Sequence, residues 1–144
     1  MIRLATAADA SGITRLLTQL EYPGTEAFLG SNLEEMLPDP RELLLVWADA
    51  ARGTERITGF LSADFSIYPQ LKGRIALIKA LAVDENARSA GIGRQLEAEL
   101  ARQAREKGCV AVIVHCHTRR TRAHEFYYRQ GFEESPKYLI KRLM

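Results

Sequence analysis

The stretch from Arg74 to Cys116 constrains the fold of this chain most, because it reads as a strand, a helix and a second strand. Its first part, RIALIKALAV, is an almost continuous apolar run, which is typical of a strand buried on both faces. Its last part, CVAVIVHC, predicts the second strand. Apolar residues at every fourth position between them predict a helix with one buried stripe: Ile92, Leu96, Leu100 and Ala104. Such a unit crosses over in the right-handed sense, so we expect the two strands to be parallel.

Two helices are expected between a short first strand and the rest of the sheet. MIRLA, residues 1–5, predicts the strand, and Thr6 with Asp9 three positions later forms the pattern of a helix capping box. The apolar face of the first helix would consist of Ile13, Leu16, Leu17 and Leu20. Thr25 is the expected cap of the second helix. The buried side of that helix would consist of Leu29, Leu33, Met36 and Leu37.

A predicted hairpin follows these helices. Its strands are ELLLVWADA, residues 42–50, and ITGFLSADFSI, residues 57–67, and the turn between them is ARGTER. The chain would thus contain both helices and strands (α/β), with this hairpin before the pair of parallel strands. At 144 residues the chain has the size of one ordinary domain, so we expect a single domain over residues 1–144.

The composition excludes several classes of protein. Lys and Arg number 20 and Asp and Glu number 18, and this balance gives no reason to expect a nucleic-acid or membrane partner. Two cysteines, Cys109 and Cys116, are too few for a disulfide framework. No apolar run approaches the ~20 residues of a membrane span, and no signal peptide is evident. We therefore expect a cytoplasmic protein with reduced thiols.

The segment RSAGIG lies where the predicted crossover helix begins. Small residues let a ligand approach the backbone, and the free N–H groups of a helix start attract anions. Arg88 and Arg94 add positive charge on both sides of it. The alternative is a plain tight turn that lets helix and strand pack closely. The phosphate loop G-x-x-x-x-G-K-[ST] is absent, and Leu96 stands where the dinucleotide pattern G-x-G-x-x-G needs a small residue.

Two segments together resemble the GNAT superfamily of N-acetyltransferases. LAVDENARSAGIGRQL is similar to the coenzyme A motif of that family, and AHEFYYRQGF is similar to its later motif A-x-x-F-Y-x-x-x-G-F. The resemblance implies a central mixed, mostly antiparallel sheet with one splayed parallel strand pair and about four helices. It also implies that KYLIKRL, residues 137–143, forms a closing strand.

The same resemblance implies a set of residues that bind acetyl-CoA as cosubstrate. The backbone of Leu81, Ala82 and Val83 would pair with the pantetheine arm, and one N–H near Leu81 would polarise the thioester carbonyl. The pyrophosphate would be held by the loop and first helical turn: Arg88, Ser89, Ala90, Gly91, Ile92, Gly93 and Arg94. Arg120 is a further candidate for a coenzyme contact, although relatives often have Asn there.

Tyr127 matches the tyrosine that protonates the departing thiolate in relatives. A coenzyme thiolate should have a pKa near that of cysteine, about 8.5, and a phenol with a pKa of about 10 can give it a proton. The alternative for Tyr127 is a packed core aromatic, because Phe126 and Tyr128 flank it. Tyr128 would take the role if the register were shifted by one residue.

The acceptor side is less determined by the sequence. A primary amine with a pKa near 10.4 is protonated at pH 7, so a base must remove a proton. Many relatives carry a carboxylate on the strand before the coenzyme loop, where Lys79 is the match here. Other candidates for the base are Asp64, Glu21, Tyr22 and His115.

Two function classes stay open at this point. The first is an N-acetyltransferase that moves acetyl from acetyl-CoA to a primary amine of a small molecule or a peptide by direct attack. The second is a non-catalytic domain that binds acyl-CoA or a partner. The sequence does not determine the acceptor or the oligomeric state, and a homodimer is one of the states considered.

The segment HCHTRRTRAHEFYY contains all three histidines of the chain. His115 and His117 would share one face of a strand, but no second ligand cluster with zinc spacing exists in the sequence, so we expect no metal site. The basic run is too short for a nucleic-acid arm. We interpret the segment as one wall of the site, from which Arg119, Arg120 and Arg122 could reach an anion.

Overall fold

The computed structural model describes residues 1–51, 53–88, 90–116, 120–135 and 139–144. The chain divides into two compact units, residues 1–113 and 114–144, which are described separately. One domain over residues 1–144 stays a prediction. No helix among the described residues has the length and apolar character that crossing a membrane requires.

A five-stranded mixed sheet forms the framework, with the strands in the order of the chain. The strands are β1 (Ile2–Leu4), β2 (Glu42–Ala51), β3 (Thr54–Ile67), β4 (Arg74–Val83) and β5 (Cys109–Val114). The pairs β1–β2, β2–β3 and β3–β4 are antiparallel, whereas β4 and β5 are parallel. The predicted mixed sheet with one parallel pair is therefore confirmed.

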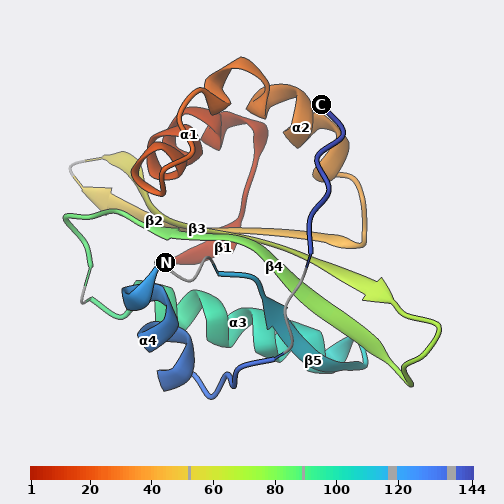
Figure 1. Ribbon diagram of the computed structural model, residues 1–144. Coiled ribbons are helices and arrows are strands. Elements are labelled where there is room, and N and C mark those ends of the chain that lie inside the picture. Colours follow the sequence, from red (N-terminus) through yellow and green to blue (C-terminus); the bar gives the residue numbers. More distant parts are fainter. Residues whose placement is uncertain (52, 89, 117–119, 136–138) are drawn as a thin grey trace. The chain divides into compact units, whose positions relative to one another are not determined.

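Four α-helices lie within the described residues, as predicted: α1 (Ala10–Gln19), α2 (Leu29–Met36), α3 (Ile92–Glu106) and α4 (Thr121–Arg129). Short 3-10 turns, Ala7–Asp9 and Thr25–Ala27, precede α1 and α2. The capping box of Thr6 and Asp9 is present, and the Thr6 N–H donates to an Asp9 carboxylate oxygen at 2.8 Å. In the first unit, α1 and α2 cover one face of the sheet and α3 covers the other (Figure 1).

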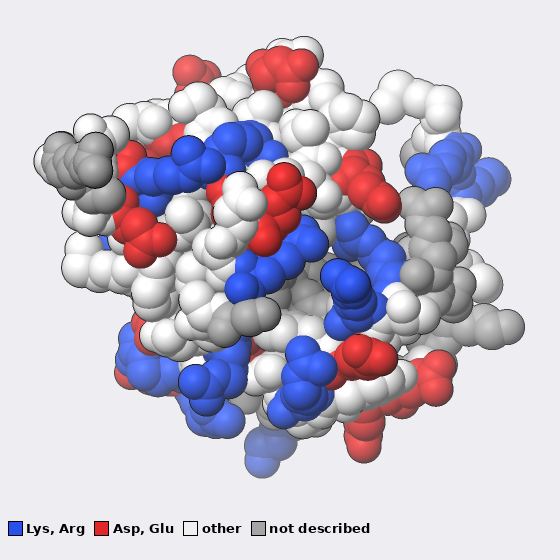
Figure 2. Space-filling model, turned by 90° about the vertical axis from the view of Figure 1, so that its left-hand side faces the viewer, with Lys and Arg blue, Asp and Glu red and all other residues white. Residues whose placement is uncertain are grey.

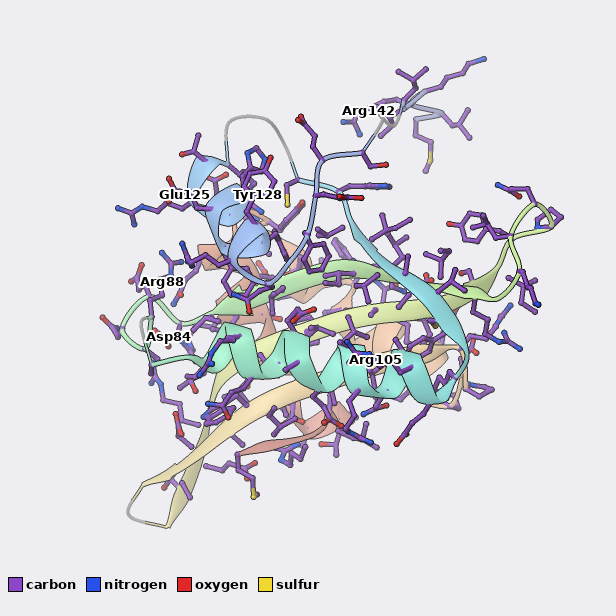
Figure 3. The ribbon with its side chains drawn as sticks, turned by 90° about the horizontal axis from the view of Figure 1, so that it is seen from below. Asp84, Arg88, Arg105, Glu125, Tyr128 and Arg142 are labelled. Carbon is purple, nitrogen blue, oxygen red and sulfur yellow. The ribbon has the colours of Figure 1, made fainter. Side chains whose placement is uncertain are left out.

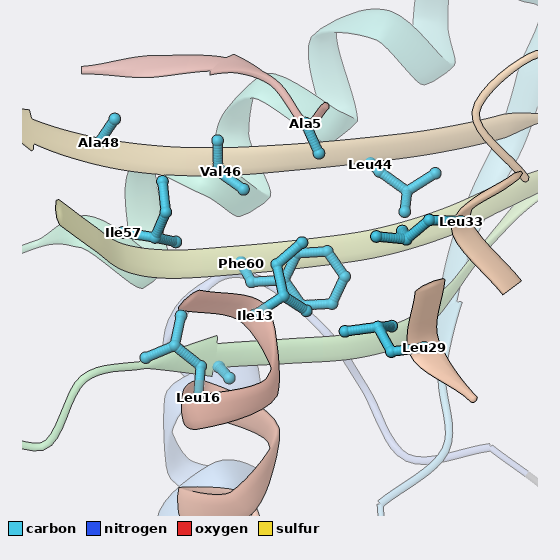
Figure 4. Close-up of a cluster of buried hydrophobic side chains, with 11 residues drawn as sticks. Ala5, Ile13, Leu16, Leu29, Leu33, Leu44, Val46, Ala48, Ile57 and Phe60 are labelled. Carbon is cyan, nitrogen blue, oxygen red and sulfur yellow. The ribbon is translucent and has the colours of Figure 1, made fainter. Parts of the chain in front are cut away.

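The face below α1 and α2 is closed by an apolar cluster (Figure 4). Ile13 and Leu16 of α1 are fully buried, as their spacing predicts. They pack with Leu33 of α2 and with Val46 and Phe60 of the sheet. This cluster fixes both helices to the strands from which the candidate site is built.

The opposite face is covered by α3, whose four predicted stripe residues are all buried. A side chain at Gly59 of β3 would collide with it, because an added Cβ would lie 2.6 Å from Ile92 Cγ2 and 3.0 Å from Leu96 Cδ1. The glycine thus lets the first turn of α3 approach the sheet closely. This contact sets the position of the helix start that follows the candidate coenzyme loop.

Two sequence predictions are corrected by the structure. Thr25 does not cap α2, because Gly24, with φ of +83°, caps the 3-10 turn and α2 begins only at Leu29. The Thr25 hydroxyl is buried and has no hydrogen-bond partner among the described residues.

The closing strand predicted for residues 137–143 is wrong for residues 139–143. Residues 137 and 138 lie outside the described residues, and 139–144 are not in a strand. Leu139 and Leu143 are 92% and 87% exposed, so these apolar side chains lack the packing that stabilises a strand.

Candidate functional site

The loop that follows β4 is fixed to the sheet through Asp84. This carboxylate is 1% exposed and accepts hydrogen bonds from Arg15 of α1, from Arg56 of β3 at 3.2 Å and from the Asn86 N–H at 2.9 Å. The Asp84 N–H in turn donates to the Thr58 carbonyl oxygen at 2.9 Å. The Asn86 N–H and the two guanidinium groups lower the pKa of Asp84 to about 2.

Replacing Asp84 should therefore destabilise the first unit. We expect Asp84→Asn to lower the free energy of unfolding by about 2 kcal/mol at pH 7, since each pKa unit corresponds to about 1.4 kcal/mol. The folded-state pKa lies below the unfolded value of about 3.9, so this stabilisation is present above pH 4 and is lost as the pH falls toward 2. Urea unfolding of the wild type and of Asp84→Asn at pH 7 and at pH 3 measures the difference in their free energies of unfolding. An equal difference at the two pH values would contradict this origin.

The predicted anion site lies where α3 begins. Gly91 is the N-cap with φ of +77°, a conformation that favours glycine. The first intrahelical bond is donated by the Gln95 N–H to the Gly91 carbonyl oxygen at 3.0 Å, so the N–H groups of Ile92, Gly93 and Arg94 precede the hydrogen-bonded part of the helix. No acidic residue lies in this first turn. The helix start can therefore receive an anion.

Two arginines of the first unit lie on either side of this helix start along the chain. Arg88 and Arg94 are exposed, and Ala90 beside them is exposed too, whereas Ser89 lies outside the described residues. Figure 3 shows Arg88 and Asp84 beside the start of α3, whereas Arg105 lies toward its end. On the face drawn in Figure 2, Lys and Arg side chains are interspersed with Asp and Glu. The geometry brings together the predicted coenzyme residues of the first unit, apart from Ser89.

The end of β4 provides the strand edge that a pantetheine arm would need. One side of Leu81, Ala82 and Val83 pairs with β3. On the other side the parallel ladder starts near Arg74, whose N–H donates to the Gly108 carbonyl oxygen at 3.2 Å. β5 has 6 residues and β4 has 10, so a ladder that starts near Arg74 would end before Leu81 to Val83. Their outer N–H and C=O groups can then pair with an extended ligand.

Lys79, the expected substitute for a carboxylate, is held by two acidic residues that sequence reasoning did not connect with it. Its ammonium lies 2.6 Å from Glu42 Oε2 and 3.9 Å from Asp64 Oδ2. Asp64 was one candidate for the base, whereas Glu42 was missed. Only the cross-strand register could have revealed the cluster, because the three residues lie on three different strands.

The second unit contains the tyrosine motif. Tyr127 is 8% exposed and packs edge-to-face on Phe126 and Phe132, with ring centroids 5.1 and 5.2 Å away. Tyr128 is 53% exposed. Tyr127, Arg120 and His115 all belong to this unit, so their roles toward the loop of the first unit stay predictions. Burial favours Tyr127 over Tyr128 for a role that needs a positioned hydroxyl.

The two thiols and the described metal-ligating side chains bear on other kinds of chemistry. Burial raises the pKa of both Cys109 and Cys116, so neither is activated as a nucleophile. Among the described residues, no group of three His, Cys, Asp or Glu side chains could hold a metal ion. His117 and Arg119 lie outside the described residues, so the interpretation of this segment as a wall of the site stays a prediction.

Comparison with known proteins identifies the family of this chain. Residues 12–132 match the model of the acetyltransferase (GNAT) family. Glucosamine 6-phosphate N-acetyltransferase 1 of Oryza sativa subsp. japonica is 33% identical over 137 residues, which cover 92% of this chain and 81% of that protein. Both findings support acetyl transfer, and nothing in them supports the non-catalytic alternative.

Solved structures have the same fold. Glucosamine-6-phosphate N-acetyltransferase of Arabidopsis thaliana is 21% identical, with a TM-score of 0.83 over 100% of this chain and 98% of its own. An acetyltransferase of Trypanosoma brucei is 25% identical, with a TM-score of 0.81 over 99% of both chains. An aminoglycoside N-acetyltransferase solved with coenzyme A has a TM-score of 0.78, covers 100% of this chain and 99% of its own, and is 20% identical. The chain belongs to the GNAT acetyltransferase family and is an acetyl-CoA-dependent N-acetyltransferase.

Proposed function

We propose that the acceptor is the primary amine of a small polar molecule and that an amino sugar phosphate is the first candidate. The observation that carries this proposal is the 33% identity, over 92% of this chain, to a protein named for acetylating glucosamine 6-phosphate. A peptide amine is the competing acceptor, because the family resemblance alone does not distinguish the two.

Acetyl-CoA would be held in the first unit by backbone groups and arginines. The pyrophosphate would receive hydrogen bonds from the N–H groups of the loop and first turn, residues 88–94, at the positive end of the α3 dipole. Arg88 and Arg94 would add charge. The pantetheine arm would lie along Leu81 to Val83 as an added strand. The exposed loop and the missing acidic residue in the first turn of α3 support this assignment.

The reaction would be a direct attack of the neutral amine on the thioester carbonyl carbon. A backbone N–H near Leu81 would stabilise the oxyanion, and Tyr127 would give a proton to the departing thiolate. The raised pKa values of Cys109 and Cys116 support a reaction without an acetylated cysteine intermediate.

A panel of amines tests the acceptor class, with release of the coenzyme thiol as the readout. The panel contains glucosamine 6-phosphate, glucosamine, an aminoglycoside and a short peptide with a free N-terminus. We expect the highest kcat/KM with glucosamine 6-phosphate. A higher value with the peptide than with any small amine would overturn the proposed acceptor class.

A further inference from the structure

Three neighbouring strands bring a lysine and two carboxylates together in the first unit. Glu42 of β2 is opposite Asp64 of β3, which is opposite Leu77 of β4. Lys79 reaches back to both carboxylates, at 2.6 Å from Glu42 and 3.9 Å from Asp64. Residues 42, 44, 60 and 64 share one face of the sheet, since side chains alternate along a strand. Leu44 and Phe60 belong to the cluster below α1 and α2, so the carboxylates lie on that face.

A β-bulge places Lys79 in this position. Ser62 pairs with Ala80 and Ala63 pairs with Ile78, so Lys79 is the extra residue of β4. Bulges re-aim side chains and often lie next to active sites. The bulge lies between the carboxylates and Leu81, the residue near which the thioester carbonyl is expected.

The two carboxylates are held differently. Glu42 makes the close ion pair with Lys79, whereas Asp64 is farther from the ammonium and accepts a hydrogen bond from Ser66 Oγ at 2.9 Å. The Asp64 side chain is 22% exposed. Two carboxylates and one ammonium leave the cluster with one net negative charge. Asp64 is the carboxylate that the ammonium holds less closely, and we regard it as the one better placed to take a proton from a ligand.

We propose that Asp64 is the base that deprotonates the acceptor and that Lys79 and Glu42 are residues that position it. This role rests on the proposed function. The ammonium N–H bond of the acceptor breaks as an O–H bond forms on Asp64, through one ordered water where the distance requires it. The freed lone pair forms the C–N bond, and the C–S bond then breaks. The thiolate gains one proton and the new amide nitrogen loses one, an exchange that would pass through Tyr127 if it has the role proposed above.

Charged side chains from two strands and from the residue before β2 lie near Asp64. Lys79 faces it from β4 and Glu42 faces it from β2. Arg41 precedes β2 and lies close enough for Asp64 to contribute to its raised pKa, although its main partner is Asp39.

The decisive variants are Asp64→Asn and Lys79→Met, measured as kcat against pH with the best amine of the panel. Asp64→Asn should lose about 10²-fold in kcat at pH 7, the usual scale for losing base catalysis, and should recover as the pH approaches the pKa of the amine. Lys79→Met should move the acidic limb of kcat to higher pH, because removal of a neighbouring cation raises the pKa of a carboxyl. Asp39→Asn, a carboxylate outside the cluster, is the matched control and should leave the profile unchanged. The dissociation constant of acetyl-CoA should stay unchanged in all three.

The outcomes separate this role from the proposed function. If the wild type turns over the amine and neither variant changes the pH profile of kcat, Asp64 is not the base. The proposed acetyl transfer to that amine would still hold. If Asp64→Asn fails to fold, an unmoved acidic limb in Lys79→Met is sufficient to overturn the assignment. Absence of amine turnover in the wild type would remove the proposed acceptor chemistry and this role together.

Discussion

Tyr127→Phe should lower kcat by about 10²-fold or more while the protein stays folded and binds acetyl-CoA. The substitution removes one hydroxyl and keeps the ring that packs on Phe126 and Phe132, so the free energy of unfolding should barely change. The loss should appear mainly in kcat, because the hydrogen bond strengthens as charge develops on the leaving thiolate. Steady-state kinetics with the best amine of the panel, beside a thermal unfolding curve, measure both effects.

Tyr128→Phe is the matched control for this prediction. It removes the same hydroxyl from the neighbouring position, where the side chain is 53% exposed, and should change kcat little. An inactive Tyr128→Phe beside a fully active Tyr127→Phe would show that the role belongs to the neighbouring residue. Full activity in both would mean that the thiolate needs no tyrosine in this enzyme.

Gly91→Val should abolish most of the affinity for acetyl-CoA. The backbone of Gly91 has φ of +77°, where a β-branched residue is strained by about 1–3 kcal/mol, so the turn should change its conformation. Losing two charged hydrogen bonds of about 1.5 kcal/mol each weakens binding by about 10²-fold. Calorimetric titration of acetyl-CoA measures this.

Gly108→Val at the other end of α3 separates strain from binding. Gly108 has φ of +76°, and an added Cβ would meet no atom within 4 Å, so the backbone penalty should be similar. We expect Gly108→Val to lose stability and to keep its affinity for acetyl-CoA. Equal affinities in a folded Gly91→Val and the wild type would remove the loop from the coenzyme site.

The strand–helix–strand unit could be predicted because its signals are local. The buried stripe of α3 recurs at every fourth position from Ile92 to Ala104, β4 is an almost continuous apolar run, and β5 is a continuous one. Thr25 was misassigned because the chain turns at Gly24, and no pattern in the sequence shows that a glycine there adopts a positive φ. Residues 139–143, LIKRL, contain three large apolar residues that are common in strands, but strand formation depends on a neighbouring strand, which composition does not supply.

The clusters that position the candidate site could not be predicted, because their members are distant in the chain. Arg15 and Asp84 are 69 residues apart, and Glu42 and Lys79 are 37 apart. The loop RSAGIG could be predicted as an anion site, because its small residues and the helix start are adjacent in the sequence. The partners of Lys79 depend on a bulge and on the register of three strands, which only the folded sheet determines.

The most direct test of acetyl transfer follows an isotope-labelled acetyl group from acetyl-CoA by mass spectrometry. The purified protein is incubated with labelled acetyl-CoA, first alone and then with the best amine of the panel. Direct attack predicts an unmodified protein in the first sample, and in the second one N-acetylated, labelled amine for each coenzyme A released. Coenzyme A release without labelled amine, or a labelled protein that passes its acetyl group to the amine, would contradict the account.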